Sequence, residues 1–302
     1  MTRHIHDWDT DIVYLSDKLE VFFKDFCHRL IEKFGEMGIE YGIINGTKDI
    51  WCRDYMPIQI QDKLFVGYDY NPDYLNDEPA YPHIKRLSHL KGKDLRTIQR
   101  DLWQNNQFPY KLNDSKIVLD GGNVVICDKY VVLTDKVYVE NGCETDAEKA
   151  SLKQTLSDYF GGLIPVIIPW KPYGDDVFGH SDGMIKFQRR DWDYKPYALI
   201  SPLTKKDTAT QFEALGKEFY LDIISVPENL RAPGFYKYAW AYINYLQVGN
   251  KILVPAFNLP SDVYVKDLIQ KYNPGCLVDN IEMREIAECG GALHCITWNI
   301  KK

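Results

Sequence analysis

Short runs of apolar residues, several of them alternating with polar ones, recur along most of the chain. Runs such as DIVYLS (11–16), YVVLT (130–134) and IPVIIP (164–169) are rich in β-branched and aromatic residues and predict short strands. Further strands are expected at 39–44, 56–61, 116–120, 123–128, 184–188, 198–202, 222–226, 251–257 and 293–297.

Helical periodicity interrupts this pattern at wide intervals. Phe22, Phe26, Leu30 and Phe34 share one face of a predicted helix that ends near Gly38, and those rings are expected to be core. Further helices are expected near 145–160, 205–218, 236–247 and 262–272. Strands with a helix every 50 to 60 residues favour an α/β fold. Because no linker or composition shift divides the chain, a single domain is expected over 1–302.

One segment stands apart from the strands and helices. YDYNPDYLNDEPAYP (68–82) is rich in turn formers and tyrosine. It predicts a long surface loop and is a candidate lid.

Composition excludes several classes of protein. No apolar run approaches the roughly 18 residues of a membrane span, and MTRHIHDWDTD at the N-terminus resembles no signal peptide, so a cytoplasmic location is expected. The net charge of −7 argues against nucleic acid as a partner. Seven cysteines without a CxxC pair favour reduced thiols over disulfides or structural zinc.

Polar residues that could take part in chemistry recur about every 60 residues along the chain. Asp54, Asp120 and His180 are 66 and 60 residues apart, and Cys295 follows His180 by 115, close to twice 58. This spacing suggests five units around an axis, each contributing one loop to a common centre.

The residues at these positions fit more than one function. Trp51 beside Asp54 suits a cation, since aromatic faces and carboxylates both attract positive charge. His180 and Asp182 fit a metal site, an acid/base histidine beside a binding carboxylate, or a polar turn. Metal binding is disfavoured because the remaining histidines lie in no ligand-spaced cluster with carboxylates; His4 and His6 fall in an N-terminus expected to be frayed.

DGGN (120–123) fits either a hairpin turn or a turn that points a side chain inward. Gly121 and Gly122 permit the tight turn, which would direct Asp120 or Asn123 toward the centre.

Cys295 favours a catalytic role for these candidate residues. If 293–297 is a strand, His294 and Cys295 point to opposite faces, so an acid or base must come from elsewhere. A thiol, one histidine and several carboxylates suit attack on a positively charged carbon. A guanidinium group fits, because its paired N–H donors match carboxylates.

The ordered motifs resemble those of agmatine deiminases and bacterial peptidylarginine deiminases. WCRD resembles their Trp-x-Arg-Asp, DGGN their Glu-Gly-Gly turn, and GHSDG their Gly-His-x-Asp. YINYL with ILVPAF is similar to their Tyr-x-Asn-Phe and Val-Val-Pro stretch, and GGALHCIT to their Gly-Gly-x-x-His-Cys-x-Thr. The set spans roughly residues 40 to 300. It implies a five-bladed pseudo-symmetric α/β propeller (pentein) of ββαβ-like units.

By position, the resemblance implies roles for five residues. Cys295 would be the nucleophile, His180 the general acid and then base, and Asp54 and Asp182 a clamp on the guanidinium nitrogens. Asp120 would orient His180, although the family usually has the longer Glu there. Two carboxylates near Cys295 should raise its pKa until a guanidinium binds.

The resemblance implies a hydrolase without cofactor or metal that acts on a small cationic guanidinium substrate. Agmatine, giving N-carbamoylputrescine and ammonia through a covalent S-alkylthiouronium, would place the enzyme in polyamine biosynthesis. Free arginine, for which Arg231 is a candidate carboxylate anchor, peptidylarginine and amidinotransfer remain alternatives, as do a metal-dependent hydrolase and a non-catalytic binding protein on the same fold. The chain lacks the family's usual N-terminal aromatic-Pro-His region, which leaves the substrate open. The sequence leaves a homo-oligomer open as well.

Overall fold

The two ends of the chain meet in one three-stranded sheet. Strand β1 (Ile12–Ser16) pairs antiparallel with β15 (Thr297–Ile300) and parallel with β2 (Glu40–Ile44). Because parallel neighbours need a crossover connection, helices α1 (Asp17–Phe22) and α2 (Lys24–Met37) link β1 to β2. The structure, a computed structural model, describes residues 4–170, 178–189, 196–201 and 215–302.

Four more sheets in the described residues repeat this strand order, a hairpin followed by a parallel third strand. They consist of β3 (Ile58–Gln61), β4 (Leu64–Val66) and β5 (Lys111–Asn113); β6 (Val125–Cys127), β7 (Tyr130–Thr134) and β8 (Ile164–Ile168); β9 (Ile185–Gln188), β10 (Tyr197–Ile200) and β11 (Tyr220–Ile223); and β12 (Leu246–Val248), β13 (Lys251–Ala256) and β14 (Leu277–Glu282). The molecule is therefore an α/β protein of five small ββαβ-like units.

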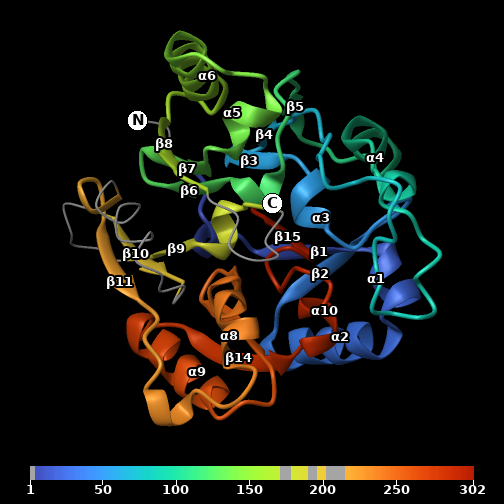
Figure 1. Cartoon of the computed structure of the whole chain (residues 1–302), viewed down its shortest axis with the longest axis vertical. Coiled ribbons are helices and arrows are strands. Elements are labelled where there is room, and N and C mark those ends of the chain that lie inside the picture. The colour runs from blue at the N-terminus through green and yellow to red at the C-terminus, as the bar shows by residue number, and fades with distance from the viewer. Residues whose placement is uncertain (1–3, 171–177, 190–195, 202–214) are drawn as a thin grey trace.

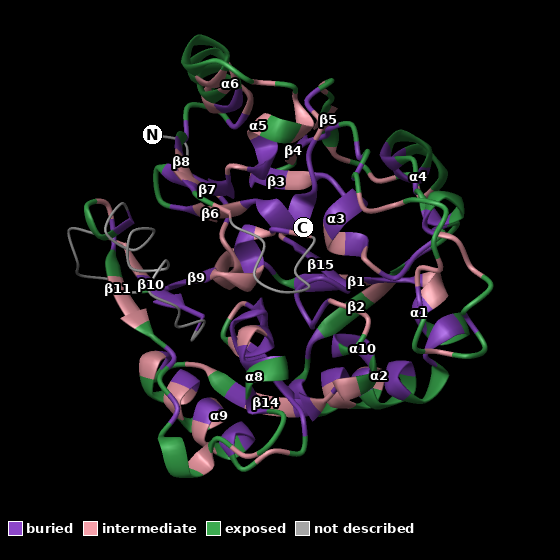
Figure 2. Ribbon diagram, in the orientation of Figure 1, coloured by how far each residue is buried: buried purple, intermediate pink, exposed green. Residues whose placement is uncertain are grey.

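Helices cross between the second and third strands of the units and show a buried side and an exposed side (Figure 2). These crossovers are α4 (Gln99–Asn105), α6 (Asp146–Tyr159) and α9 (Ser261–Tyr272). The remaining short helices include the 3-10 turns η1 (Asp7–Asp9), η2 (Gly92–Leu95) and η5 (Glu228–Leu230), with α5 (Lys136–Glu140), α8 (Phe235–Tyr238) and α10 (Arg284–Ala287). Of the helix expected over 205–218, residues 205–214 lie outside the described residues.

The first predicted helix is confirmed, but as two pieces. Its phenylalanines are buried, as helical spacing required. The backbone of Phe23 leaves the helical region (φ −139°, ψ 58°), which separates α1 from α2. Gly38 ends α2 with a φ of +63°, a left-handed conformation that suits glycine.

Five short segments precede the first strands of the five units and gather near the middle of the view in Figure 1. Helix α3 contacts η3, η3 contacts η4, and η4 contacts η6. The segments are α3 (Cys52–Tyr55), η3 (Gly121–Asn123), η4 (Ser181–Gly183), η6 (Ala239–Ile243) and the turn at 292–296. Each unit thus contributes one segment to a shared centre, as the 60-residue spacing predicted.

Some sequence predictions were wrong in their boundaries. The closing strand begins at Thr297, so His294 and Cys295 lie in a turn rather than in a strand. The run 116–120 makes only an isolated bridge at Val118, and the helix expected over 236–247 is short and ends before β12. Strands β4, β5, β12 and β14 were missed, because their patterns are too short or too polar to stand out.

Candidate active site

The central segments place one polar residue from each unit next to the others. Asp54 lies in α3, Asp120 caps η3, Asp182 lies in η4, Asn244 ends η6, and Cys295 lies in the last turn. All five are buried. Since apolar surroundings are costly for such groups unless they interact, their contacts with one another define a polar site inside the fold.

Cys295 lies beside two polar side chains from neighbouring units. Its sulfur is 3.3 Å from Asn244 Oδ1 and 3.8 Å from Asp182 Oδ2. Burial raises the pKa of this thiol well above its usual value, and the carboxylates of Asp182 and Asp54 raise it further. The thiol is therefore protonated in the ligand-free protein, as the sequence led us to expect.

Asn244 is a site residue that the sequence analysis did not single out. Its Oδ1 also accepts hydrogen bonds from the backbone N–H groups of His294 (3.1 Å) and Cys295 (3.3 Å). Its Nδ2 donates to the backbone carbonyl of Asp182 at 3.4 Å. One amide therefore fixes the turn that carries the thiol. Two features of the sequence pointed to this position. The interval of 115 residues between His180 and Cys295 is about twice the usual spacing, and the YINYL motif contains Asn244.

His180 lies between two carboxylates. Its Nε2 is 3.0 Å from Asp120 Oδ2, and its Nδ1 is 3.6 Å from Asp54 Oδ1. Burial disfavours charge on the ring, but Asp54 and Asp120 outweigh it and raise the pKa of His180 to about 9. His180 is accordingly an imidazolium at neutral pH and can donate a proton.

Asp54 is held by the glycine turn of the next unit. The Gly122 N–H donates to Asp54 Oδ1 at 3.1 Å. A Cβ at Gly122 would lie 2.6 Å from both Asp54 Oδ1 and His180 Nδ1, so only glycine fits. Burial raises the pKa of Asp54 to about 7; His180 opposes the rise, while Asp120 and Asp182 add to it.

Asp182 contacts both members of the His-Cys pair. His294 Nδ1 lies 2.7 Å from Asp182 Oδ2, the same oxygen that faces the Cys295 sulfur. The opposite-face expectation depended on a strand over these residues, whereas the strand begins at Thr297, and in this turn both side chains reach Asp182. Burial alone would raise the pKa of Asp182, but the hydrogen bond from His294 reverses the effect and lowers it.

A buried lysine, Lys136, lies next to Asp120, the carboxylate within hydrogen-bond distance of His180. Lys136 Nζ is 3.5 Å from Asp120 Oδ2 and 3.1 Å from both Glu140 Oε1 and Asp73 Oδ1. Its ammonium therefore places a positive charge beside the carboxylate of Asp120.

The same lysine anchors the predicted loop at 68–82. Asp73 belongs to this loop, and the Tyr74 ring lies 4.9 Å from Lys136 Nζ and 6.1 Å from the His180 ring. Tyr68, Tyr70 and Tyr81 of the loop are buried. The loop therefore packs over the site rather than lying free on the surface.

The three predicted substrate-binding residues have different surroundings. Trp51 is partly buried at the start of α3 and packs so closely on Gly291 that a Cβ there would lie 2.2 Å from its ring. Asn123 is buried, but its Oδ1 accepts from the Thr134 N–H at 2.8 Å, which fits the turn-forming alternative. Arg231 is exposed, and its hydrogen bonds go to Val226 and Tyr236 in its own region.

The arrangement combines a thiol, an imidazolium and two carboxylates in one buried place. Asp54 and Asp182 can receive a planar cation, the thiol can attack it, and His180 can protonate a departing group. Among the residues that the structure describes, no group of three or more His, Cys, Asp or Glu side chains is arranged to hold a metal ion.

Comparison with known proteins identifies the family. Residues 16–300 match the model of the Porphyromonas-type peptidyl-arginine deiminases, and the chain belongs to this family. A curated relative, "Putative agmatine deiminase 1" of Listeria monocytogenes, is 24% identical over 237 residues, which cover 70% of this chain. The match spans 64% of the length of that relative.

Solved structures share the fold at lower identity. The agmatine deiminase of C. jejuni superposes with a TM-score of 0.69 at 16% identity, covering 99% of this chain and 96% of that one. An agmatine deiminase of Enterococcus faecalis gives a TM-score of 0.71 at 13% identity, with the same coverage of both chains. In the described part of the chain, no helix combines the length and apolar character needed to cross a bilayer.

Proposed function

We propose that this protein is a hydrolase that deiminates a guanidinium compound through a covalent intermediate on Cys295. The observation that carries the proposal is the Cys295 sulfur 3.8 Å from the carboxylate of Asp182, with Asp54 and a charged His180 beside them. A binding scaffold would have no need for a thiol and a proton donor at its centre.

The reaction would proceed in two halves. Asp54 and Asp182 bind the guanidinium nitrogens, the Cys295 thiol loses its proton to solvent, and the thiolate attacks the central carbon. His180 gives its proton to the departing nitrogen, ammonia leaves, and an S-alkylthiouronium remains. His180, now neutral, takes a proton from water, and the hydroxide attacks the same carbon. The C–S bond then breaks, the leaving sulfur takes the hydroxyl proton to become a thiol again, and the ureido product forms.

Substrate binding would itself activate the thiol. Asp182 and Asp54 raise the pKa of Cys295 in the empty site. A guanidinium held between them adds a positive charge beside the sulfur and lowers that pKa. The thiolate would therefore form only when a cation is in place, which protects it from other electrophiles.

Agmatine is the substrate we propose, with N-carbamoylputrescine as the product in polyamine biosynthesis. The names of the relatives support this choice. The proposal also includes a five-bladed propeller, supported by five sheets of one strand order, a cytoplasmic location and no cofactor. Whether the chain forms a homo-oligomer stays a prediction.

The test is product analysis with the purified full chain. Agmatine, free arginine and an arginine peptide are incubated separately, and ammonia and ureido product are measured. Agmatine should give both products, and Cys295→Ala should lower the rate by at least about a thousandfold. Cys127→Ala is the matched control, since Cys127 is a buried thiol in β6, and its rate should stay unchanged.

Each other outcome has a defined meaning. Turnover by Cys295→Ala would overturn the nucleophile. Product from arginine or the peptide alone would correct the substrate. A covalent adduct on Cys295 that yields product only with an added amine would indicate an amidinotransferase. Neither product nor adduct from any substrate would overturn the proposal in favour of a binding protein.

A further inference from the structure

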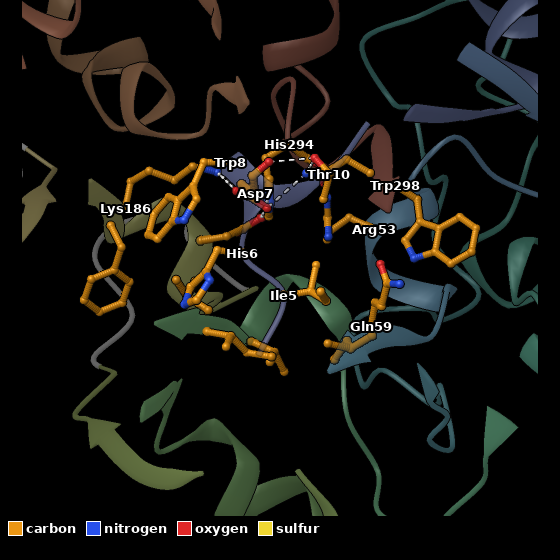
Figure 3. A pocket seen from close by; sticks show the side chains of 17 residues that line it. Ile5, His6, Asp7, Trp8, Thr10, Arg53, Gln59, Lys186, His294 and Trp298 are labelled. Carbon is orange, nitrogen blue, oxygen red and sulfur yellow. Dashed lines mark hydrogen bonds and ion pairs between the residues drawn. The ribbon is translucent and has the colours of Figure 1, made fainter. Parts of the chain in front are cut away.

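Behind the site, the N-terminal residues close the other side of the molecular centre. A pocket there is lined by residues 5–8 and by side chains that also belong to the site, among them Asp182 and, labelled in Figure 3, Arg53 and His294. The expectation of a frayed N-terminus is wrong for His4 and His6, since His4 Nδ1 already lies 3.2 Å from the Ile60 carbonyl oxygen. His6 Nε2 accepts from the Asp128 N–H at 2.9 Å, and its ring stacks on Trp8 at 4.5 Å.

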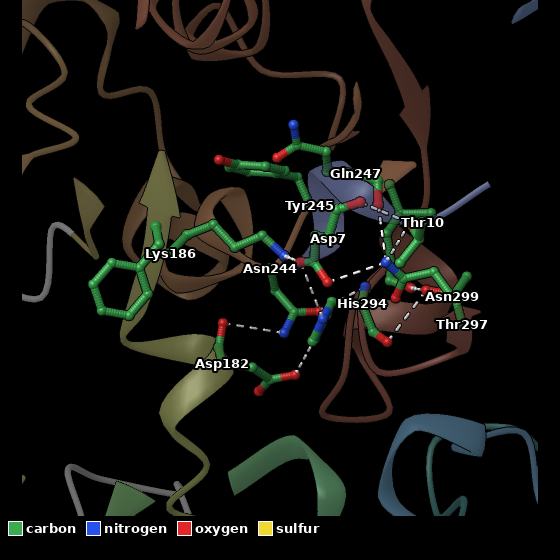
Figure 4. Close-up of polar contacts among 12 residues, drawn as sticks. Asp7, Thr10, Asp182, Lys186, Asn244, Tyr245, Gln247, His294, Thr297 and Asn299 are labelled. Atoms are coloured by element: carbon green, nitrogen blue, oxygen red, sulfur yellow. Dashed lines mark hydrogen bonds and ion pairs between the residues drawn. The ribbon is translucent and has the colours of Figure 1, made fainter. Parts of the chain in front are cut away.

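Asp7 points from this N-terminal turn toward the back of the site (Figure 4). Its Oδ2 is 2.5 Å from Lys186 Nζ, and its Oδ1 accepts from Asn299 Nδ2 at 3.0 Å. The same Oδ2 is 3.7 Å from His294 Nε2. The Lys186 side chain is 5% exposed and that of Asp7 is 27% exposed, so water is excluded from the lysine side of the ion pair. A carboxylate from residue 7 and an ammonium from β9 thus face the histidine that precedes Cys295.

The protonation of His294 follows from its two neighbours. Asp182, 2.7 Å from Nδ1, has a lowered pKa and is a carboxylate, so Nδ1 carries the hydrogen and donates it. At Nε2 the distance of 3.7 Å to Asp7 is too long for a hydrogen bond. Burial, Arg53 and Lys186 lower the pKa of His294 to about 4, against the opposing pull of Asp182 and Asp7. The ring is therefore neutral.

A neutral ring at this position leaves the charge of Asp182 available. A neutral imidazole orients Asp182 by one hydrogen bond without cancelling its charge. An imidazolium in the same place would pair with Asp182 and compete with a bound cation. Asp7 by itself favours that imidazolium, and Lys186 cancels the effect by pairing with Asp7.

We propose that Lys186 is a positioning residue: by pairing with Asp7 it keeps His294 neutral, so that Asp182 keeps its negative charge for the guanidinium. The proposal rests on the guanidinium site proposed above. It adds the N-terminal turn and Lys186 to the machinery of substrate binding. The groups that face His294 are Asp182 from η4, Asp7 from η1, Lys186 from β9, Arg53 from α3 and the adjacent Cys295.

The test separates charge from structure with a cycle of variants of the full-length protein. Lys186→Met leaves Asp7 without its cation, whereas Asp7→Asn/Lys186→Met removes both charges. Histidine-selective nitrogen NMR follows the titration of His294, assigned with His294→Gln. KM and kcat for agmatine are measured from pH 5.5 to 8, and Asp11→Asn serves as the surface control, because Asp11 is exposed and accepts a hydrogen bond from the Lys302 N–H.

The single variant should raise the pKa of His294 from about 4 by about 2.5 units, because it removes a cation and leaves a carboxylate unpaired beside the ring. Its KM relative to the unchanged protein should grow about tenfold as pH falls to 5.5, while kcat stays within about twofold. The double variant should restore both the titration and KM. A merely structural role for Lys186 would instead weaken both variants alike and leave the titration in place.

An unchanged His294 titration in Lys186→Met would overturn the inference. A rise in KM in the double variant equal to that in the single variant would overturn it as well. Thermal melting identifies a variant that fails to fold, and Lys186→Gln then replaces Lys186→Met in the cycle. If no substrate turns over at all, the proposed function fails, whereas the NMR titration still decides the role of Lys186 and Asp7.

Discussion

Asp54 and Asp182 occupy equivalent places in two units of the fold, yet their surroundings give them different affinities for a proton. Each lies in the short segment before the first strand of its unit, and each is buried. Burial raises the pKa of Asp54 to about 7, and its acidic neighbours add to the effect. Asp182 accepts the hydrogen bond of His294, and its pKa is lowered.

The difference shows how one fold can place two carboxylates in separate roles. Asp182 is charged before a ligand arrives and supplies the first attraction for a cation. Asp54 is partly protonated at neutral pH and ionises fully only when a positive charge enters. Packing two carboxylates and a thiol together is costly, and this division limits the charge that the empty site must hold.

Neutralising each carboxylate in turn should give unequal losses. Asp182→Asn keeps the hydrogen bond from His294 but removes a charge that is always present. kcat/KM for agmatine should fall about a thousandfold, the scale of one partner lost from a buried charge pair. Asp54→Asn should cost about thirtyfold at pH 6.5, where part of the charge is already absent. Steady-state kinetics and melting curves decide, and equal losses would contradict the asymmetry.

The binding of a guanidinium should depend on pH through Asp54. Because its pKa is raised to about 7 in the empty site, binding below that pH must release its proton. Affinity should therefore rise by up to about tenfold per pH unit as pH increases toward 7, and level off above it. His180, with a pKa of about 9, stays charged throughout this range.

Calorimetry with agmatine and the inactive Cys295→Ala variant measures this linkage from pH 5.5 to 8. Comparing buffers of different ionisation enthalpy counts the released protons. Asp54→Asn in the same background should lose both the pH slope and the proton release. A flat affinity profile with Asp54 present would show that Asp54 is ionised before the ligand binds.

The smallest effect is expected at Arg231, whose hydrogen bonds go to neither Asp54 nor Asp182. Its guanidinium donates to the Val226 carbonyl at 2.8 Å and to the Tyr236 hydroxyl at 3.3 Å. Exposed polar contacts contribute little, so Arg231→Ala should change KM for agmatine by less than about twofold. A large rise in KM confined to free arginine would instead support its role as a carboxylate anchor.

Parts of the site could be predicted from sequence because the chemistry depends on residue type and regular spacing. Asp54, Asp120, His180 and Cys295 stood out as polar residues beside turn formers at intervals near 60 residues. Asn244 fell in the double interval and was overlooked, because an amide in an apolar run carries no obvious chemistry. Asp7 gave no signal at all, since nothing local distinguishes it from other acidic residues near a terminus.

The sequence by itself determined the alternation of short strands with helices, the residue types available for chemistry, and the repeat that brings one segment of each unit to a common centre. Only the tertiary structure decided that His180 lies beside Asp54 as well as Asp120, that His294 and Cys295 share a turn and both reach Asp182, and which groups carry protons. The physical reason is that protonation depends on burial and on charges within a few ångströms, and here those charges come from residues 7, 54, 120, 182 and 186.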